Sequence, residues 1–256
     1  MNEYVVVPAG KNITINLNGK TLSNVGLSDP EAKGVIVNKG TLAIQDSGKD
    51  GMVVATTSKV AIANVGELIV KSGKITNAVE KKTGSDGTEY QYVNYLLNNN
   101  GMVTIDGGSF VMDERMTKIN SSIVKNGWVS TADSVDGNDV VKWESGKVAT
   151  MTINGGVFKG PTYVKNDNYG EMTINGGSFV TTADVNQMGV TGNCVFNGGK
   201  LTVNRGTFDN TASLNAGAPF YVGGRAVASE TIINGGVLSS WATAAPARRA
   251  VAINTR

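Results

Sequence analysis

Short runs of alternating apolar and polar residues recur along the chain, and none keeps helical spacing beyond one or two turns. The clearest runs place a threonine between two aliphatic residues, as in Met172, Thr173 and Ile174. Side chains alternate between the two faces of a strand, so this order directs the threonine outward and the aliphatic residues inward. The pattern therefore predicts short strands with one buried face.

Four of these runs are nearly identical, and weaker copies extend along the chain. The four are MVTIDGGSF (102–110), MTINGGVF (151–158), MTINGGSF (172–179) and LTVNRGTF (201–208). The weaker copies are ITINLNGKTL (13–22), LAIQDSGKDG (42–51), LIVKSGKI (68–75), TIINGGVL (231–238) and the fragment VAIN (251–254). Aligning the aliphatic residue before the Asn-like position gives nine anchors: Ile15, Ile44, Val70, Ile105, Ile153, Ile174, Val203, Ile233 and Ile253. The shortest spacings between anchors, 20 and 21 residues, indicate the length of the bare repeat.

A second recurring piece precedes each anchor, and it consists of an apolar run followed by Asn or Gly. Examples are VVVPAG (5–10), VIVNKG (35–40), AIANVG (61–66), YLLNNNG (95–101), YVKNDNYG (163–170) and CVFNGG (194–199). Gly and Asn tolerate the positive φ angles that sharp corners require. Each repeat is therefore predicted to hold about three short strands separated by corners.

A unit of about 20 residues cannot bury its own inner face, so the copies are expected to stack as parallel rungs. Like residues then lie above like residues. One internal column is predicted to contain Ile105, Ile153, Ile174, Val203 and Ile233, and a second to contain Phe110, Phe158, Phe179, Phe208 and Leu238. A turn ladder, with amides bonded between rungs, is predicted from Asn154, Asn175, Asn204 and Asn234.

These repeats, together with the opening VVVPAGKNITINLNGKTLSN, resemble the right-handed parallel β-helix proteins of the pectin-lyase-like class. The resemblance covers nearly the whole chain and includes bacteriophage fibre or tailspike proteins and bacterial surface β-helix proteins. It implies an all-β fold: a single right-handed parallel β-helix solenoid of about nine rungs over residues 1–256, with lateral insertions at 76–94 and 111–150. A β-propeller or a sandwich with antiparallel strands is the alternative architecture, but propeller repeats of about 40–50 residues exceed most of the spacings here.

The 48-residue spacing between Ile105 and Ile153 leaves two interpretations open. SSIVKNG (121–127) matches the upstream strand piece, so an additional rung is one possibility. The other is a single lateral excursion over 111–150 in which VVKWESGKV (140–148) is the returning arm of a hairpin.

Composition narrows the chemistry more than it narrows the fold. The chain has 33 Gly and 27 Asn but no His, which excludes Ser-His-Asp, Cys-His and His-metal sites. The single cysteine, Cys194, excludes an internal disulfide framework and is expected to be a small buried apolar group. A net charge of +2 argues against a dedicated nucleic-acid binder, and no apolar run approaches the roughly 18 residues of a membrane span. No cofactor is expected.

Enzymes of the class that the chain resembles are mostly polysaccharide lyases and hydrolases, and hydrolysis needs two carboxylates about 5–10 Å apart. Stacked carboxylates should then occur at equivalent repeat positions, yet Asp106 is the only acid at the Asn-like position, where we expect it to act as a turn residue. Asp113, Glu114 and Arg115 are interpreted as an exposed charged turn. Asp133, Asp136 and Asp139 are spaced to gather round a hard cation, although neighbouring Ser, Gly and Asn fit a solvated turn equally well.

Four aromatic residues fall on or beside the predicted insertions: Tyr90, Tyr92, Trp128 and Trp143. Exposed Tyr and Trp mark recognition surfaces because they combine a large contact area with a polar edge. They are candidates for a ledge that binds sugar rings. The alternative is that they cover the insertions or a subunit contact.

The predicted strands begin at Tyr4 and end part-way through a rung, so we expect other chains to cover the open ends of the coil. Residues 76–144 carry 6 basic and 10 acidic groups and residues 145–256 carry 9 and 5, which suits self-association. We therefore expect a homo-oligomer, with a trimer favoured. The leading hypothesis is a non-enzymatic structural or adhesive virion component that contacts host-surface glycans. The first alternative is a bacterial cell-surface adhesin or carbohydrate-binding module, and the second is a polysaccharide lyase or hydrolase.

Overall fold

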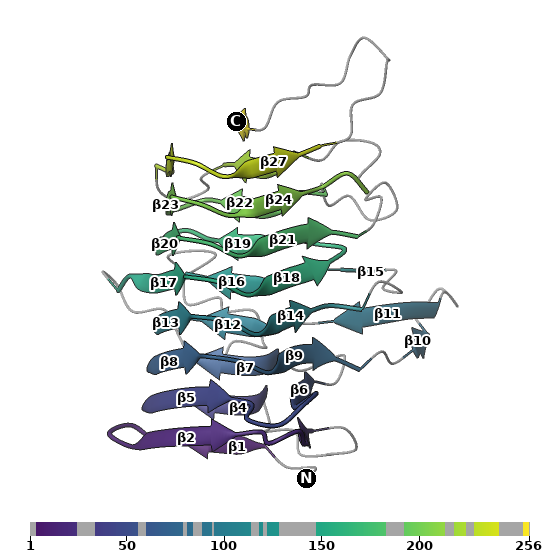
Figure 1. The fold of residues 1–256 in the computed structure, drawn as a ribbon, viewed down its shortest axis with the longest axis vertical. Helices are drawn as coiled ribbons and strands as arrows, with labels where there is room; N and C mark the ends of the chain where they lie inside the picture. Colours follow the sequence, from purple (N-terminus) through teal and green to yellow (C-terminus); the bar gives the residue numbers. More distant parts are fainter. Residues whose placement is uncertain are drawn as a thin grey trace.

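The computed structural model describes residues 4–24, 34–55, 60–78, 81–83, 89–93, 95–113, 118–119, 122–127, 147–182, 192–212, 218–223, 228–240 and 253–255. These residues form a coil whose successive turns, here called rungs, stack from the N-terminus to the C-terminus (Figure 1). No helix in this part of the chain has the length and apolarity needed to cross a membrane. The prediction of an all-β stack of parallel rungs is confirmed.

Three parallel sheets line the coil, and each rung contributes one strand to each. Sheet I holds β1 (Val5–Val7), β4 (Gly34–Asn38), β7 (Val60–Asn64), β12 (Leu97–Asn99), β16 (Val124–Asn126), β19 (Val164–Asn166), β22 (Val195–Asn197), β25 (Phe220–Val222) and β28 (Ile253–Thr255). Sheet II holds β2 (Asn12–Asn16), β5 (Thr41–Gln45), β8 (Glu67–Val70), β13 (Met102–Ile105), β17 (Ala149–Ile153), β20 (Gly170–Ile174), β23 (Lys200–Val203) and β26 (Glu230–Ile233). Sheet III holds β3 (Thr21–Ser23), β6 (Met52–Ala55), β9 (Lys74–Asn77), β14 (Ser109–Val111), β18 (Val157–Gly160), β21 (Ser178–Thr181), β24 (Thr207–Asp209) and β27 (Val237–Ser239).

The strand registers place eight of the nine sequence anchors in one column of sheet II. This column runs, rung by rung, through Ile15, Ile44, Val70, Ile105, Ile153, Ile174, Val203 and Ile233. The ninth anchor is wrong, because Ile253 pairs with Phe220 in sheet I rather than with Ile233. The described residues thus form eight complete rungs, and β28 is a single strand beyond them. The prediction of nine rungs is not confirmed.

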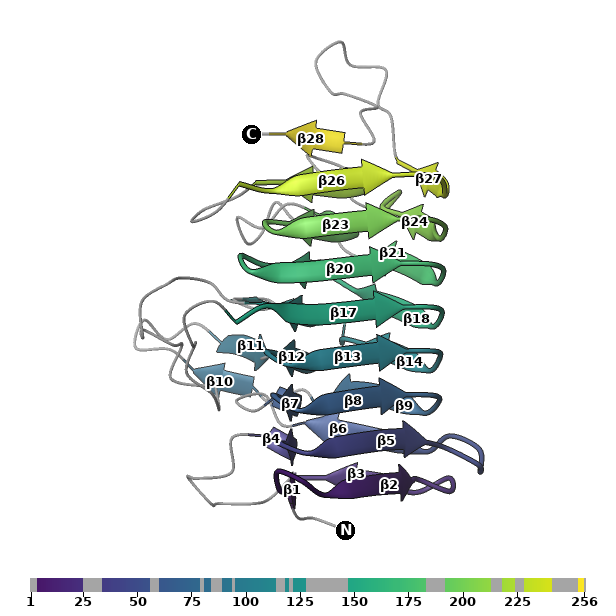
Figure 2. The same cartoon turned by 90° about the vertical axis from the view of Figure 1, so that its left-hand side faces the viewer.

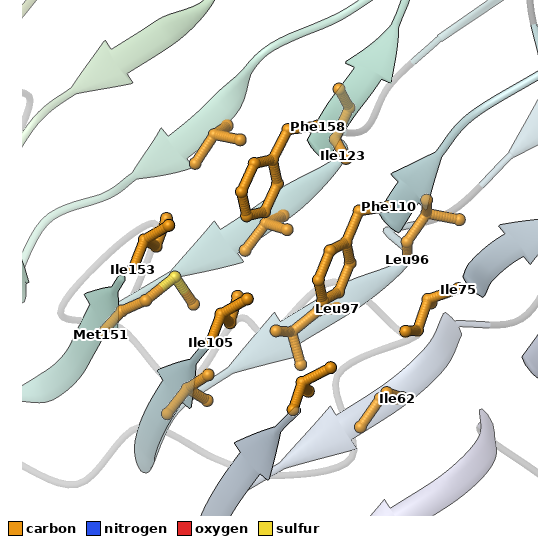
Figure 3. Packing of buried hydrophobic residues seen from close by; sticks show 14 of the residues in the cluster. Ile62, Ile75, Leu96, Leu97, Ile105, Phe110, Ile123, Met151, Ile153 and Phe158 are labelled. Carbon is orange, nitrogen blue, oxygen red and sulfur yellow. The ribbon is translucent and has the colours of Figure 1, made fainter. Parts of the chain in front are cut away.

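Phenylalanine rings stack inside the coil along sheet III. Phe110, Phe158, Phe179 and Phe208 are at most 1% exposed, and successive ring centroids lie 5.1, 4.8 and 4.8 Å apart. The interplanar angles are 7°, 6° and 11°, because the parallel register repeats one side chain at each rung. Figure 3 shows two of these rings packed among aliphatic side chains from all three sheets. This interior is the principal source of hydrophobic stabilisation.

Two asparagine ladders follow the corners of the coil. The outer ladder lies after sheet II, where Asn154 donates to Asp106, and Asn175, Asn204 and Asn234 each donate to the residue one rung below at 2.8–2.9 Å. The inner ladder lies at the end of sheet I, where five amide–amide bonds of 2.7–2.9 Å connect six side chains. Its members are Asn38, Asn64, Asn99, Asn126, Asn166 and Asn197, and each is at most 1% exposed. Sequence analysis identified only the outer ladder.

The inner ladder requires glycine close to it. A Cβ atom added to Gly66 would lie 2.0 Å from the carbonyl oxygen of Gly40, and one added to Gly101 would lie 2.3 Å from that of Gly66. Backbone atoms of adjacent rungs thus occupy the space that any side chain would need. The upstream Asn-x-Gly pattern is therefore a packing requirement at this corner.

The chain between Ile105 and Ile153 makes no additional rung, because β13 pairs directly with β17. SSIVKNG supplies β16, the sheet I strand of the fifth rung, which pairs with β12 and β19. Most of VVKWESGKV lies outside the described residues. The interpretation with an extra rung is excluded. A single lateral excursion over 111–150 is also wrong, because β16 returns to sheet I within that range.

A small separate sheet lies beside the coil. Its strands are β10 (Lys81–Thr83) and β11 (Glu89–Val93), which are antiparallel, and β15 (Lys118–Ile119), which runs parallel to β11. Figures 1 and 2 both place β10 and β11 at the level of β7 and β12. Both chain excursions thus contribute to one accessory structure.

Cys194 lies inside the coil and is 3% exposed. Its thiol donates to the carbonyl oxygen of Phe179 at 3.4 Å, and burial raises the thiol pKa from about 9 to about 12. We predict that the native protein does not react with a thiol reagent at pH 8, whereas the urea-unfolded chain reacts at once, as an absorbance assay would measure. Rapid labelling of the folded protein would contradict the buried position.

The same pKa shift predicts a pH effect on stability. The pKa of the Cys194 thiol is higher in the folded protein than in the unfolded chain. The contribution of the thiol to the free energy of unfolding is therefore fully present below about pH 9 and is lost as the pH rises toward 12. The difference in unfolding free energy between the native sequence and Cys194→Ala should shrink over that interval.

Candidate functional site

The aromatic and acidic residues singled out from the sequence are not assembled into a site within the described residues. Tyr90 and Tyr92 lie in β11 of the accessory sheet, for which the structure describes the backbone but not the side chains. Trp128, Trp143, Asp133, Asp136 and Asp139 lie outside the described residues altogether. In the part of the chain that is described, no three His, Cys, Asp or Glu side chains gather as metal ligands.

Asp106 is exposed and lies at one end of the outer asparagine ladder, where its Oδ1 accepts from Asn154 at 2.8 Å. The carboxylate therefore occupies the position that asparagine holds in the rungs above. No second carboxylate adjoins it in that column, because the next member toward the N-terminus is Lys71.

A row of three aromatic side chains and one lysine instead lies on the outer face of sheet I. It consists of Tyr163, Lys165, Phe196 and Tyr221, here called the aromatic strip. Lys165, Phe196 and Tyr221 occupy one column in successive rungs, next to the inward-facing column that contains Val164 and Val195. The ring centroids of Tyr163 and Phe196 lie 5.6 Å apart, and those of Phe196 and Tyr221 lie 5.3 Å apart. The three rings form a continuous offset stack.

Glycines set the position of two of these rings. A Cβ atom on Gly198 would lie 3.3 Å from the ring of Phe196, and one on Gly223 would lie 3.2 Å from the ring of Tyr221. Residues two apart on a strand share a face, so each ring leans over the glycine that follows it. The aromatic-x-Gly order thus creates the space for the stack.

The lysine of the strip is neutralised by its neighbour. Lys165 Nζ lies 2.6 Å from Asp167 Oδ2, and the two side chains are only 13% and 2% exposed. The same ammonium lies 5.5 Å from the centroid of the Phe196 ring. A cation over an aromatic face is favourable, more so where water is excluded. The strip is consequently an aromatic surface without net charge.

A second lysine continues the same column one rung toward the N-terminus. Lys125 pairs with Lys165 in register and is fully buried, although its position faces away from the coil interior. Its Nζ lies 5.2 Å from the centroid of the Tyr95 ring, which is itself 5% exposed. The outer face of sheet I is therefore covered at the fourth and fifth rungs. Phe196 on the seventh rung is also buried, at 9% exposed, whereas Tyr163 on the sixth rung and Tyr221 on the eighth are half-buried.

The corner beside the strip is longer than its equivalents. Residues 166–170 replace the Asn-x-Gly corner, and Asn166 Nδ2 still reaches the carbonyl oxygen of Gly170 at 3.2 Å. Tyr169 has φ of 59°, in the left-handed region that non-glycine residues seldom adopt. Unusual backbone of this kind often accompanies functional sites.

No protein-family model, curated protein or solved structure matches the chain.

The aromatic strip can contact a ligand through ring edges and two phenol groups. The stacked faces are occupied by neighbouring rings, so recognition would use the edges and hydroxyls of Tyr163 and Tyr221. Sequence reasoning missed the strip because Phe196 falls within the predicted strand piece CVFNGG, and because no strand was predicted around Tyr221. Their alternation with inward-facing Val195 and Phe220 was the available signal.

Proposed function

We propose that the protein is a non-enzymatic structural and adhesive component of a bacteriophage virion, of the fibre, tailspike or capsid-surface kind. In this proposal the coil is a right-handed β-helix of the pectin-lyase-like type, since crossovers between parallel strands are right-handed in nearly all proteins. The protein acts as a homotrimer on the virion surface. The inner asparagine ladder supports a stiff particle part, because the second to seventh rungs repeat one amide–amide bond without interruption.

The single observation that carries the adhesive role is the aromatic strip on sheet I. Tyrosine offers apolar contact area and a hydrogen-bonding hydroxyl with little conformational freedom to lose. Tyr163 and Tyr221 flank the buried ring of Phe196 at centroid distances of 5.6 and 5.3 Å, so the strip presents two half-buried tyrosines in line along the coil. A host-surface glycan with several sugar units is the ligand that this elongated, uncharged surface favours.

Alanine at Tyr163 or Tyr221 is expected to weaken glycan binding about tenfold each, in line with the loss of a well-placed aromatic contact. Binding would be measured by biolayer interferometry against a panel of purified bacterial surface polysaccharides. Tyr4→Ala is the matched control, because Tyr4 is 39% exposed on the first rung and remote from the strip. Absence of binding to every polysaccharide, or equal loss in all three variants, would contradict the role of the strip.

A bacterial cell-surface adhesin would use the same strip, so the two proposals differ in location. Mass spectrometry of purified phage particles and of bacterial wall fractions separates them. Recovery in particles supports the virion component, and recovery in the wall fraction alone supports the adhesin.

A further inference from the structure

Two faces of the coil carry exposed apolar side chains that the fold itself does not use. Met102 and Ile232, 54% and 45% exposed, lie on the outer face of sheet II. Val157 and Val237, 40% and 62% exposed, lie on the outer face of sheet III. Each alternates along its strand with a residue that faces the interior, so all four point away from the core.

The outer face of sheet II is open along its length, and Figure 2 shows no other described strand in front of it. Its central row is mostly uncharged and runs through Thr14, Ala43, Ile69, Thr104, Thr152, Thr173, Thr202 and Ile232. The outer face of sheet III has a comparable row with three valines: Val54, Val111 and Val180. Both faces are therefore suited to close contact with a flat partner.

The outward-facing groups on the two faces match at the third and eighth rungs. At the third rung, Glu67 lies on sheet II and Lys74 on sheet III. Met102 on the fourth rung of sheet II and Val157 on the fifth rung of sheet III lie one rung apart, so each would face a polar residue, Ser109 or Thr150, on the partner. At the eighth rung, Ile232 corresponds to Val237.

The charges of the two faces are also opposite in sign. On the outward positions of its strands, sheet II carries Glu67, Glu171 and Glu230 against Lys200, which is a net charge of −2. Sheet III carries Lys74 and Lys159 against Asp209, which is a net charge of +1. Complementary charge aligns partners and suppresses wrong registers.

We propose that sheet II of one copy packs against sheet III of a second copy, with the two coils side by side and parallel. Only this arrangement brings equal rungs together, so that acid meets base at the third rung and apolar meets apolar at the eighth. The contact is heterologous, and its repetition around an axis parallel to the coil closes a ring. The outer asparagine ladder, at the corner that joins the two sheets, lies nearest that axis.

The inference specifies the surfaces of the self-association proposed above and rests on it. It is independent of the glycan role, because the aromatic strip lies on sheet I and stays on the outside of such a ring.

Disulfide trapping tests the pairing at the eighth rung. Ile232→Cys and Val237→Cys are made as separate full-length proteins, mixed, and oxidised under mild conditions. The mixture is expected to give a covalent dimer of the two variants, whereas each variant alone stays uncrosslinked, since Cys194 is buried. Dimers in the single variants would indicate an isologous contact and overturn the proposal. No cross-link in the mixture would also overturn it.

A charge swap tests the pairing at the third rung. Glu67→Lys and Lys74→Glu are each expected to weaken association about tenfold in sedimentation equilibrium, and the double variant is expected to recover most of the loss. Lys39→Glu is the control, because Lys39 is exposed at the corner between sheets I and II. If the charge changes leave the association constant of the oligomer unaltered, the proposed pairing of sheets II and III is refuted but self-association is not. A native protein that stays monomeric refutes self-association as well, and neither result alters the glycan assay.

Discussion

Replacing Phe158 with alanine is expected to lower the free energy of unfolding by about 3–5 kcal/mol. Phe158 is 1% exposed and stacks on both sides, 5.1 Å from Phe110 and 4.8 Å from Phe179 between ring centroids. Alanine therefore removes the transfer energy of the ring and leaves a cavity that the neighbouring rungs cannot close, because the strand register fixes their spacing. Equilibrium urea unfolding followed by circular dichroism would measure the loss.

Phe158→Leu is the matched control for this change. Leucine keeps an apolar side chain in the column, as Leu238 does two rungs beyond Phe179, so the expected loss is about 1–2 kcal/mol. A loss below about 1 kcal/mol for the alanine variant would show that the ring is not enclosed by the stack.

Replacing Asn99 with leucine is expected to cost about 3–5 kcal/mol, although the two side chains are similar in size. Asn99 Nδ2 donates to Asn126 Oδ1 at 2.7 Å and to the carbonyl oxygen of Thr150 at 3.0 Å. Its Oδ1 accepts from Asn64 Nδ2 at 2.8 Å and from the Gly101 N–H at 3.0 Å. The residue is fully buried, so leucine leaves several polar atoms without partners and without water.

Asn175→Leu is the control, because Asn175 makes the same amide–amide bonds in the outer ladder but is exposed. Water can replace those bonds, and the expected loss is below about 1 kcal/mol. Thermal unfolding of both variants gives the comparison. Equal losses of stability at the two positions would mean that burial does not determine how much an amide–amide bond of a ladder contributes to the free energy of unfolding.

The stacking of the coil could be predicted because its signal is local and repeated. The Φ-Thr-Φ-Asn-Gly-Gly order assigns every residue a face, and eight anchors fall in register as a result. Ile253 failed for a physical reason: VAIN resembles both the sheet I and the sheet II strand pieces, and only pairing with Phe220 distinguishes them.

The inner ladder was less visible than the outer one, even though both consist of asparagines near glycine. Whether a corner buries its amides depends on how tightly adjacent rungs pack there. That packing is visible only in the structure, where a Cβ atom added to Gly66 or Gly101 would lie 2.0 or 2.3 Å from a carbonyl oxygen of the rung below. The aromatic strip escaped notice in the same way. Its rings come from the sixth to eighth rungs, and their stacking depends on a strand register that no single segment encodes.

The central claim, that the repeats are adjacent parallel rungs in register, is tested most directly by paired cysteines on the outer face of sheet II. Thr104 and Thr152 are 48 residues apart in sequence but are register partners, and neighbouring strands bring Cα atoms within disulfide range. Thr152 and Thr202 are 50 residues apart but lie two rungs apart, beyond that range. After oxidation, mass spectrometry should find an intramolecular disulfide in Thr104→Cys/Thr152→Cys and none in Thr152→Cys/Thr202→Cys. The reverse result, or equal cross-linking of both pairs, would contradict the stacked coil.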